Sequence, residues 1–276
     1  MEDQLYVTVI QSFIHWENRD ENLAGFTRLT KDVDGTDLIV LPEMFTTGFS
    51  MNPALYAEET DGESMRWMYQ TARKKNCVVT GSIMTRESGR YYNRLVWMRP
   101  SGEYLVYDKR HLFRFAGEHK HYTPGSRKLL TRVKGWKIYP LICYDLRFPV
   151  WCKNRLDAGS YDYDLMINIA NWPAARSVAW KTLLSARAIE NQSFVCGVNR
   201  VGEDGNGIDH SGDSLLAGPE GNLLWQAEPS AGSVETVTLQ KEALENSRGR
   251  LEAGLDWDTF AIETSGGQPD IRNIGS

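Results

Sequence analysis

The chain has 276 residues, with 31 Lys and Arg against 36 Asp and Glu, so its formal net charge is -5. Its 41% hydrophobic and 24% charged residues lie in the globular range and exclude a disordered or collagen-like chain. A negative net charge without a run of Lys or Arg removes the attraction that phosphate-backbone binding requires. Nucleic acid is therefore not an expected partner.

No apolar stretch is long enough to span a bilayer, and the longest are the size of a strand. Glu2 and Asp3 stand where a signal peptide would carry basic residues, so we expect a cytoplasmic protein without a membrane partner. The cysteines form no C-x-x-C pair, and we expect each to be a reduced thiol: Cys77, Cys143, Cys152 and Cys196.

Apolar periodicity predicts strands that alternate with helices, together with two hairpins. The predicted strands are Leu5–Val9, Leu38–Leu41, Val78–Met84, Tyr92–Met98, Tyr104–Tyr107, Trp136–Cys143, Leu165–Ile169 and Phe194–Asn199, with a further hairpin over Ser214–Trp225. The predicted helices are Asn22–Asp32, Glu63–Lys75 and Ser177–Asn191. This order indicates a layered α/β protein with mixed sheets.

No repeat or long linker divides the chain, so residues 1–263 are expected to form one domain. From about Thr264 the apolar periodicity disappears. We expect residues 264–276 to be a tail that is either flexible or in contact with another subunit.

Polar or reactive side chains follow three of the predicted strands. Glu43 comes after Leu38–Leu41, Cys143 ends its strand, and Asn171-Trp172 follows Leu165–Ile169. The carboxyl ends of strands in α/β sheets are common ligand sites, so these ends are expected to converge on one pocket.

Cys143 has two interpretations. A cysteine in an apolar run is most often a buried small hydrophobic residue. It becomes a nucleophile only beside a base or a positive charge, which Glu43 and Lys109 could supply. Each of those two residues taken alone could equally be a solvated surface charge.

Motifs around these residues resemble the nitrilase superfamily of carbon-nitrogen hydrolases, whose catalytic set is Glu, Lys and Cys in that chain order. Glu43 lies in LPEMFTTGF, Lys109 in YDKRHLF and Cys143 in LICYDLRFP. Further blocks match in the same order along nearly the whole chain: Tyr92-Asn93, Tyr122-Thr123-Pro124-Gly125, ARAIENQ at Ala186–Gln192, and Gly212-Asp213-Ser214. HLFRFAGEHKHYTPG and NWPAARSVAWKTLLSARAIENQ are most similar to the bacterial omega-amidase branch.

The resemblance implies a four-layer α-β-β-α sandwich, with two mixed sheets packed face to face, that assembles as a homodimer and needs no cofactor or metal. It also implies ammonia release from the terminal amide of 2-oxo dicarboxylic acid monoamides, such as 2-oxoglutaramate and 2-oxosuccinamate, through a thioester. Cys143 would be the nucleophile and Glu43 the proton shuttle. Lys109 and the backbone N–H of Tyr144 would hold the oxyanion.

Further site residues are expected around this set. Glu118 occupies the position of an additional pocket carboxylate in the family, although it could be a solvated loop residue. Arg176 is the candidate for binding the substrate carboxylate, because a guanidinium binds carboxylates bidentately. Arg147 is the competing candidate, although its position is more often structural in the family. Trp172 is either a pocket wall or a core aromatic residue. Trp257 and Phe260 are expected at a dimer contact.

Other functions fit the sequence less well. The spacing of His111, His119 and His121 loosely suggests zinc but lacks a helical two-ligand arrangement. The segment Gly202–Gly207 fits neither a phosphate loop nor a calcium loop and is expected to be a solvent loop. Other branches of the superfamily remain alternatives, namely N-carbamoyl amino acid hydrolases, aliphatic amidases and nitrilases. An inactive amidase-fold binding module is the alternative outside enzymes.

Overall fold

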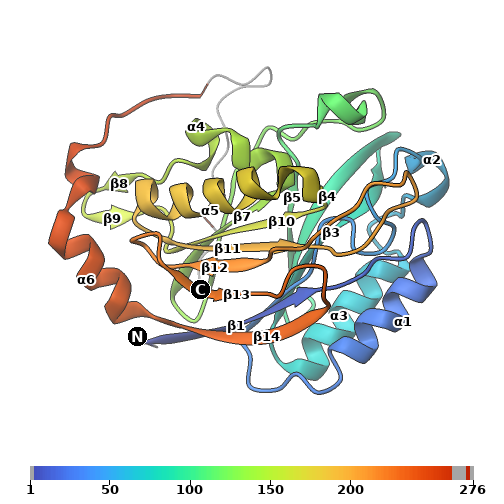
Figure 1. Cartoon of the computed structure of the whole chain (residues 1–276), viewed down its shortest axis with the longest axis horizontal. Helices are drawn as coiled ribbons and strands as arrows, with labels where there is room; N and C mark the ends of the chain where they lie inside the picture. The colour runs from blue at the N-terminus through green and yellow to red at the C-terminus, as the bar shows by residue number, and fades with distance from the viewer. Residues whose placement is uncertain (1–2, 263–271, 274–276) are drawn as a thin grey trace.

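Two β-sheets stacked face to face form the centre of the molecule (Figure 1). The computed structural model describes residues 3–262 and 272–273 of the chain. The first sheet has the strand order β14-β1-β2-β3-β4-β5. Its strands are β1 (Gln4–Gln11), β2 (Leu38–Val40), β3 (Val78–Glu87), β4 (Arg90–Met98), β5 (Tyr104–Asp108) and β14 (Ser233–Gln240).

The second sheet has the order β13-β12-β11-β10-β7-β6-β15. Its strands are β6 (Leu129–Val133), β7 (Trp136–Ile142), β10 (Leu165–Ala170), β11 (Phe194–Asn199), β12 (Leu215–Ala217), β13 (Leu223–Gln226) and β15 (Arg272–Asn273). Parallel and antiparallel pairs occur in both sheets, so both are mixed. A separate short pair joins β8 (Leu156–Asp157) to β9 (Ser160–Tyr161).

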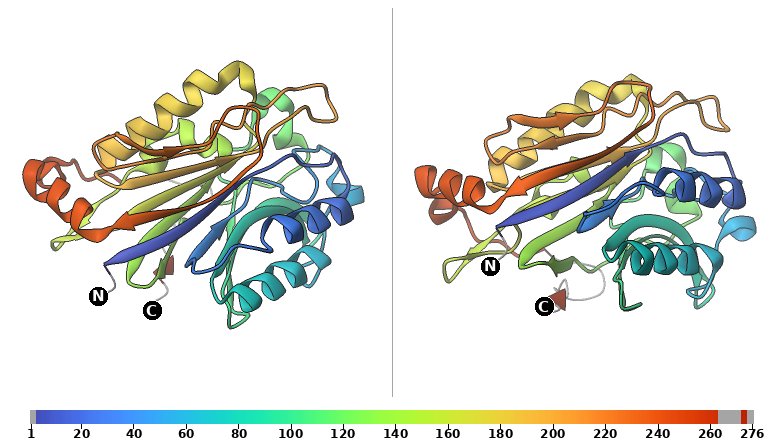
Figure 2. Two further views of the ribbon diagram at one scale, coloured as in Figure 1. Left: turned by 60° about the horizontal axis from the view of Figure 1, so that its bottom comes forward. Right: turned by 90° about the horizontal axis from the view of Figure 1, so that it is seen from below.

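Helices cover the outer faces of the sheets and complete the predicted four layers. Figure 2 shows α1 and α3 on the far side of the first sheet and α5 on the far side of the second. The helices are α1 (Arg19–Leu29), α2 (Pro53–Tyr56), α3 (Glu63–Lys75), α4 (Pro149–Cys152), α5 (Ser177–Asn191) and α6 (Lys241–Leu251). Single 3-10 turns are η1 (Arg114–Ala116), η2 (Glu118–Lys120), η3 (Cys143–Arg147), η4 (Ala174–Arg176) and η5 (Ala253–Asp256).

The apolar run that forms β2 is buried on both faces, as its composition predicts. Leu38 and Val40 belong to the core between the sheets, whereas Ile39 and Leu41 belong to the core under α1 and α3. Successive strand side chains point to opposite faces, so only a strand covered on both sides carries four apolar residues in a row.

The sequence does not predict several elements of the described chain, among them β14, α6 and β6. The edge strand β14 exposes most of its side chains and has a weak apolar pattern, SVETVTLQ. Helix α6 buries only Leu244 and Ser247, so it lacks a clear apolar face. Strand β6 is short, and the sequence predicts a loop in its place. The predicted strand ending at Cys143 stops at Ile142, and Cys143 begins the turn η3.

Most of the tail predicted at 264–276 lies outside the described residues. Within it, Arg272 and Asn273 pair in parallel with Leu129 and Leu130 of β6. Among the described residues, no helix has the length and apolar character that crossing a membrane requires.

Candidate active site

The candidate residues gather at one end of the sandwich, where strands of both sheets finish. Glu43 follows β2 and Lys109 follows β5 in the first sheet. Cys143 follows β7 and Asn171 follows β10 in the second. The loops after parallel strands lie at one edge, so residues far apart in sequence become neighbours.

Hydrogen-bond donors surround the carboxylate of Glu43, whose side chain is fully buried. Its Oε1 atom accepts from Lys109 Nζ at 2.7 Å and from Asn93 Nδ2 at 2.8 Å. Its Oε2 atom accepts from the backbone N–H of Asn171 at 2.8 Å. These three hydrogen bonds fix the orientation of the carboxylate.

Lys109 is buried between two carboxylates. Its Nζ atom lies 2.7 Å from Glu43 and 3.1 Å from Glu118. Burial opposes its charged form, but the negative charges of Glu118 and Glu43 outweigh burial and raise the pKa of Lys109 above its ordinary value. Lys109 is therefore a permanent cation at neutral pH.

Glu118 is fully buried, so the alternative of a solvated loop residue is wrong. Its carboxylate accepts from Asn93 Nδ2 at 3.2 Å and from the backbone N–H of Phe113 at 2.5 Å. Burial raises the pKa of Glu118, Lys109 opposes that rise, and the charge of Glu43 adds to it.

Cys143 occupies a sharp turn, with a backbone φ of 45° in the left-handed region. A non-glycine residue in this region is strained, and such strain is common where a side chain must project into a site. Its thiol lies close enough to Glu43 and Lys109 for both charges to act on it. Burial raises the pKa of Cys143 well above its ordinary value, and the charge of Glu43 adds to this effect while Lys109 opposes it.

Asp145 ties the Cys143 turn to the segment that carries Lys109. Its buried carboxylate accepts hydrogen bonds from Ile142 N at 3.2 Å and from Tyr107 Oη at 2.7 Å. It also accepts from the backbone and ring of His111. These hydrogen bonds fix the position of the Cys143 turn relative to the segment that carries Lys109.

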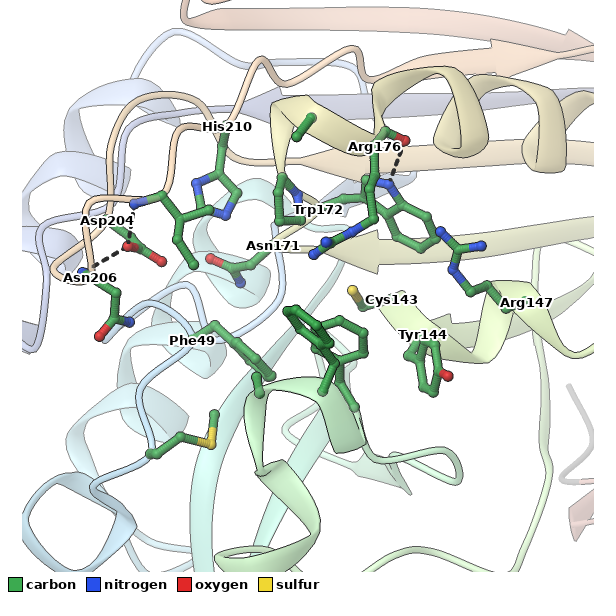
Figure 3. Close-up of a pocket in the computed structure, with 17 residues that line it drawn as sticks. Phe49, Cys143, Tyr144, Arg147, Asn171, Trp172, Arg176, Asp204, Asn206 and His210 are labelled. Carbon is green, nitrogen blue, oxygen red and sulfur yellow. Dashed lines mark hydrogen bonds between the residues drawn. The ribbon is translucent and has the colours of Figure 1, made fainter.

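A cavity of about 450 Å³ opens over Cys143 (Figure 3). Aromatic and aliphatic side chains make up most of its wall, and a few polar groups interrupt it. The lining residues are Phe49, Met51, Phe113, Phe115, Ala116, Cys143, Tyr144, Arg147, Asn171, Trp172, Pro173, Ala175, Arg176, Asp204, Asn206, Ile208 and His210.

Both candidate arginines line this cavity. The guanidinium of Arg176 lies over the rings of Phe113 and Phe115. The guanidinium of Arg147 lies 4.8 Å from the ring centre of Trp172, and this competing arginine also lines the cavity. Arg147 follows Cys143 by one helical turn, which brings it to the cavity.

Trp172 is both a wall of the cavity and an aromatic residue of the core. It lines the cavity, yet only 3% of its surface is exposed and its ring packs against Trp180. Its Nε1 atom donates to the backbone oxygen of Arg176 at 2.9 Å, which fixes the ring.

The segment predicted as a solvent loop at Gly202–Gly207 also reaches the site. Asp204 and Asn206 line the cavity at the end away from Arg147, as Figure 3 shows. The Asp204 carboxylate accepts from the backbone of Asn206 at 2.8 Å, so the loop is held by its own contacts. The prediction of a loop is confirmed, but the loop is not confined to solvent.

The structure adds residues to which the sequence analysis gave no role. Asn93 links the two carboxylates, and Asn171 fixes Glu43 through both its backbone and its side chain, whose Nδ2 donates to Glu43 O at 2.6 Å. Their signals were present, since Asn93 lies in a family motif and Asn171 ends a strand. Nothing in the local sequence identified Phe113 or Phe115.

The histidines considered for metal binding are dispersed. His111 is bonded to Asp145, whereas His119 and His121 are exposed. In the part of the chain that the structure describes, no group of three or more His, Cys, Asp or Glu residues is arranged to hold a metal ion.

A four-layer sandwich with a thiol, a carboxylate and an ammonium group at one end of its strands defines the class, a hydrolase of carbon–nitrogen bonds. Residues 7–248 match the carbon-nitrogen hydrolase family, and the chain belongs to this family.

Similar proteins agree with this assignment. The chain is 42% identical over 258 residues to omega-amidase YafV of Escherichia coli K12, covering 94% of this chain and 98% of that protein. It is 34% identical over 243 residues to the 2-oxoglutaramate amidase of Bacillus subtilis, covering 86% and 92% of the two chains.

Among solved structures, XC1258 from Xanthomonas campestris is similar, with a TM-score of 0.92 and 42% identity over 94% of this chain and 99% of that one. That protein is a CN-hydrolase superfamily member with an arsenic adduct in its active site. The predicted superfamily, omega-amidase branch and sandwich fold are confirmed by these matches.

Proposed function

We propose that this enzyme releases ammonia from the terminal amide of 2-oxo dicarboxylic acid monoamides, with 2-oxoglutaramate and 2-oxosuccinamate as substrates. The observation that carries the proposal is the buried carboxylate of Glu43, which accepts a hydrogen bond from the Lys109 ammonium group at 2.7 Å and whose charge acts on the Cys143 thiol. A base, a nucleophile and a cation that lie close together are the requirements of amide hydrolysis through a thioester.

The first half of the reaction acylates Cys143. Because the pKa of Cys143 lies well above 9.0, the resting group is a thiol and has to lose its proton as it attacks. Glu43 accepts this proton while Sγ bonds to the amide carbon. The oxyanion is stabilised by Lys109 Nζ and the backbone N–H of Tyr144. Glu43 then passes the proton to the departing nitrogen, the C–N bond breaks and ammonia leaves.

The second half hydrolyses the thioester. Glu43, again ionised, takes a proton from water, and the hydroxide oxygen bonds to the acyl carbon. The tetrahedral intermediate collapses with cleavage of the C–S bond. The sulfur regains the proton from Glu43, and the dicarboxylic acid leaves.

Glu118 has a supporting role in this proposal. Its charge adds to that of Glu43 in keeping Lys109 protonated. Since its oxygens are hydrogen-bonded to Lys109, Asn93 and the backbone of Phe113, it also fixes the position of the ammonium group.

The substrate carboxylate is assigned to Arg176, and Trp172 forms the adjacent wall. The guanidinium of Arg176 lies on aromatic rings inside the cavity, so its N–H groups remain available to a carboxylate. A largely nonpolar wall that carries guanidinium groups suits a short chain that is anionic at one end and carries an amide at the other.

Ammonia release from 2-oxoglutaramate, measured beside an N-carbamoyl amino acid and a simple aliphatic amide, tests the proposal. We expect the wild type to prefer 2-oxoglutaramate and Cys143→Ala to lose activity on every substrate. Cys77→Ala is the matched control, because Cys77 is a buried thiol that does not line the cavity.

If the enzyme prefers a different amide and hydrolysis of that amide still requires Cys143, the proposed substrate is wrong and the proposed mechanism stands. Full turnover by Cys143→Ala would contradict the mechanism itself. Arg176→Ala should weaken the apparent affinity for 2-oxoglutaramate, seen as a higher KM, far more than the affinity for the uncharged amide.

We also propose that the enzyme acts in the cytoplasm as a homodimer whose contact includes Trp257 and Phe260. Phe260 is exposed, whereas Trp257 packs partly against Tyr161 of its own chain. Chain truncation after residue 255 should shift the mass measured by light scattering from dimer to monomer. A truncated chain that stays dimeric would contradict this contact.

A further inference from the structure

Phe115 is unusual for a large aromatic side chain because 86% of its surface is exposed, although it lines the cavity. It lies in the turn η1, and it lines the cavity together with Cys143. Its exposed ring is available to contact a ligand or a neighbouring charge.

The partner of Phe115 is the guanidinium of Arg176. The Arg176 Cζ atom lies 5.8 Å from the ring centre of Phe115 and 5.3 Å from that of Phe113. Among the described residues, Arg176 has no ion pair with a carboxylate. Aromatic rings therefore hold this cation instead of a counter-charge.

The turn that carries the two rings is anchored to the catalytic network. The backbone N–H of Phe113 donates to the buried Glu118 carboxylate at 2.5 Å. The Phe113 ring also packs edge-on against Tyr144, with ring centres 5.0 Å apart. Glu118 in turn contacts Lys109. The position of the aromatic pair is thereby tied to the same groups that surround Cys143.

We propose that Phe115, together with Phe113, forms an aromatic platform that determines the specificity of the enzyme for amides with a free carboxylate. A guanidinium over aromatic faces keeps its N–H groups free at its edge, where a carboxylate binds bidentately. This inference rests on the proposed function, because it assumes that Arg176 binds the substrate carboxylate.

Arg147 contacts a buried aromatic ring, whereas Arg176 contacts the exposed ring of Phe115. Its guanidinium lies over Trp172, which is nearly buried and packed against Trp180. Substitution of Trp172 would disturb the core as well as the cavity. Phe115 projects from the surface instead, so its removal changes the surroundings of Arg176 with little effect on folding.

Steady-state kinetics of Phe115→Ala test the platform with two substrates, 2-oxoglutaramate and pentanamide, an uncharged amide of the same chain length. We expect the preference for the anionic amide, expressed as the ratio of kcat/KM values, to fall about five- to tenfold. For the anionic amide, the variant should show a higher KM and an unchanged kcat. Phe115→Trp should restore the preference, because tryptophan is the strongest cation–π partner.

The matched control is Phe13→Ala. Phe13 is another exposed aromatic residue, with the guanidinium of Arg200 5.5 Å from its ring centre, but it does not line the cavity. We expect this variant to keep the wild-type preference.

An equal change of kcat/KM for both substrates in Phe115→Ala, or no change, would overturn the platform. Failure of the proposed function would give different results. If the wild type has no preference for the anionic amide, or if Arg176→Ala retains that preference, the assignment of the carboxylate to Arg176 is wrong. If both of those tests succeed and Phe115→Ala keeps the preference, only the platform is wrong.

Discussion

Asp145 accepts two hydrogen bonds from His111, one from its backbone N–H at 3.0 Å and one from its ring Nδ1 atom at 2.8 Å. Asp145 lies two residues after Cys143, and His111 lies two residues after Lys109. One buried carboxylate thus connects the turn that carries Cys143 to the segment that carries Lys109. The Phe148 ring stacks on the His111 ring with centres 3.7 Å apart and limits its movement.

Substitution Asp145→Ala should therefore separate the two segments. We expect kcat for amide hydrolysis to fall about a hundredfold, the effect of a shift of about 1 Å between reacting groups. His111→Asn retains a donor near the position of Nδ1 and should lose much less activity than His111→Leu. Stopped assays of ammonia release, with circular dichroism to verify folding, check this order.

Asp157→Ala is the control, because Asp157 is an exposed residue in the short strand β8. Equal activities of the two His111 variants would contradict a positioning role for this hydrogen bond.

The raised pKa of Cys143 predicts the pH at which its thiolate appears. Since burial and then the charge of Glu43 raise this pKa above 9.0, and Lys109 lowers it, the thiolate should be absent at neutral pH. Glu43→Gln removes a negative charge and should move the titration to lower pH. Lys109→Met removes a positive charge and should move it to higher pH.

The absorbance of the thiolate at 240 nm follows each titration. For every protein, the absorbance of the same protein with Cys143→Ser is subtracted. A thiolate step in the wild type between pH 6 and 8 would show that the resting nucleophile is already ionised, contrary to this prediction.

Asp164 should contribute to stability in a pH-dependent manner. Its side chain is only 4% exposed and pairs with Lys241 and Arg248 of α6. Burial raises the pKa of Asp164, but these cations outweigh burial and hold the pKa below its ordinary value of 3.8. The contribution of ionised Asp164 to folding stability is therefore complete above about pH 3.8. It is lost as the pH falls through the lower pKa that Asp164 has in the folded state.

We expect Asp164→Asn to lower the free energy of unfolding by roughly 3 kcal/mol at pH 7. The difference from the wild type should shrink below about pH 4, as urea titrations at several pH values would reveal. Asp162→Asn breaks the more exposed pair with Arg155 and should cost less than about 1 kcal/mol. A constant difference at all pH values would contradict an ionic origin.

Gly125 should be required for the position of Lys109. A Cβ atom at Gly125 would lie 2.1 Å from the backbone oxygen of Asp108, and Gly125 N donates to Lys109 O at 2.9 Å. Gly125→Ala must therefore displace the Lys109 segment. We expect a loss of about 1–3 kcal/mol in stability and at least about a tenfold loss of kcat.

Gly249→Ala provides the contrast, because Gly249 lies in α6 and a Cβ there meets nothing within 4 Å. That substitution should raise stability by roughly 0.5–1 kcal/mol without a change in activity. Thermal melts and amidase assays of both variants check the pair, and a fully active Gly125→Ala enzyme would contradict the argument.

Strong periodicity made much of the fold predictable. The predicted helices Glu63–Lys75 and Ser177–Asn191 agree with α3 and α5 at both ends. In α3 the buried residues Met65, Met68 and Ala72 recur at helical spacing, which is a local property of the sequence. Strand β14 lacked such a signal, since an edge strand with many exposed residues is recognised only by its pairing with β1.

The sequence by itself determined the family and indicated Glu43, Lys109 and Cys143 as the candidate catalytic residues, because each of them lies in a short motif whose residues are neighbours along the chain. Tertiary structure alone decided that Glu118 is buried, that Arg147 reaches the cavity, and that the rings of Phe113 and Phe115 support Arg176. Burial and ring contacts depend on loops that come together only when both sheets have stacked, and no local pattern encodes the distance between them.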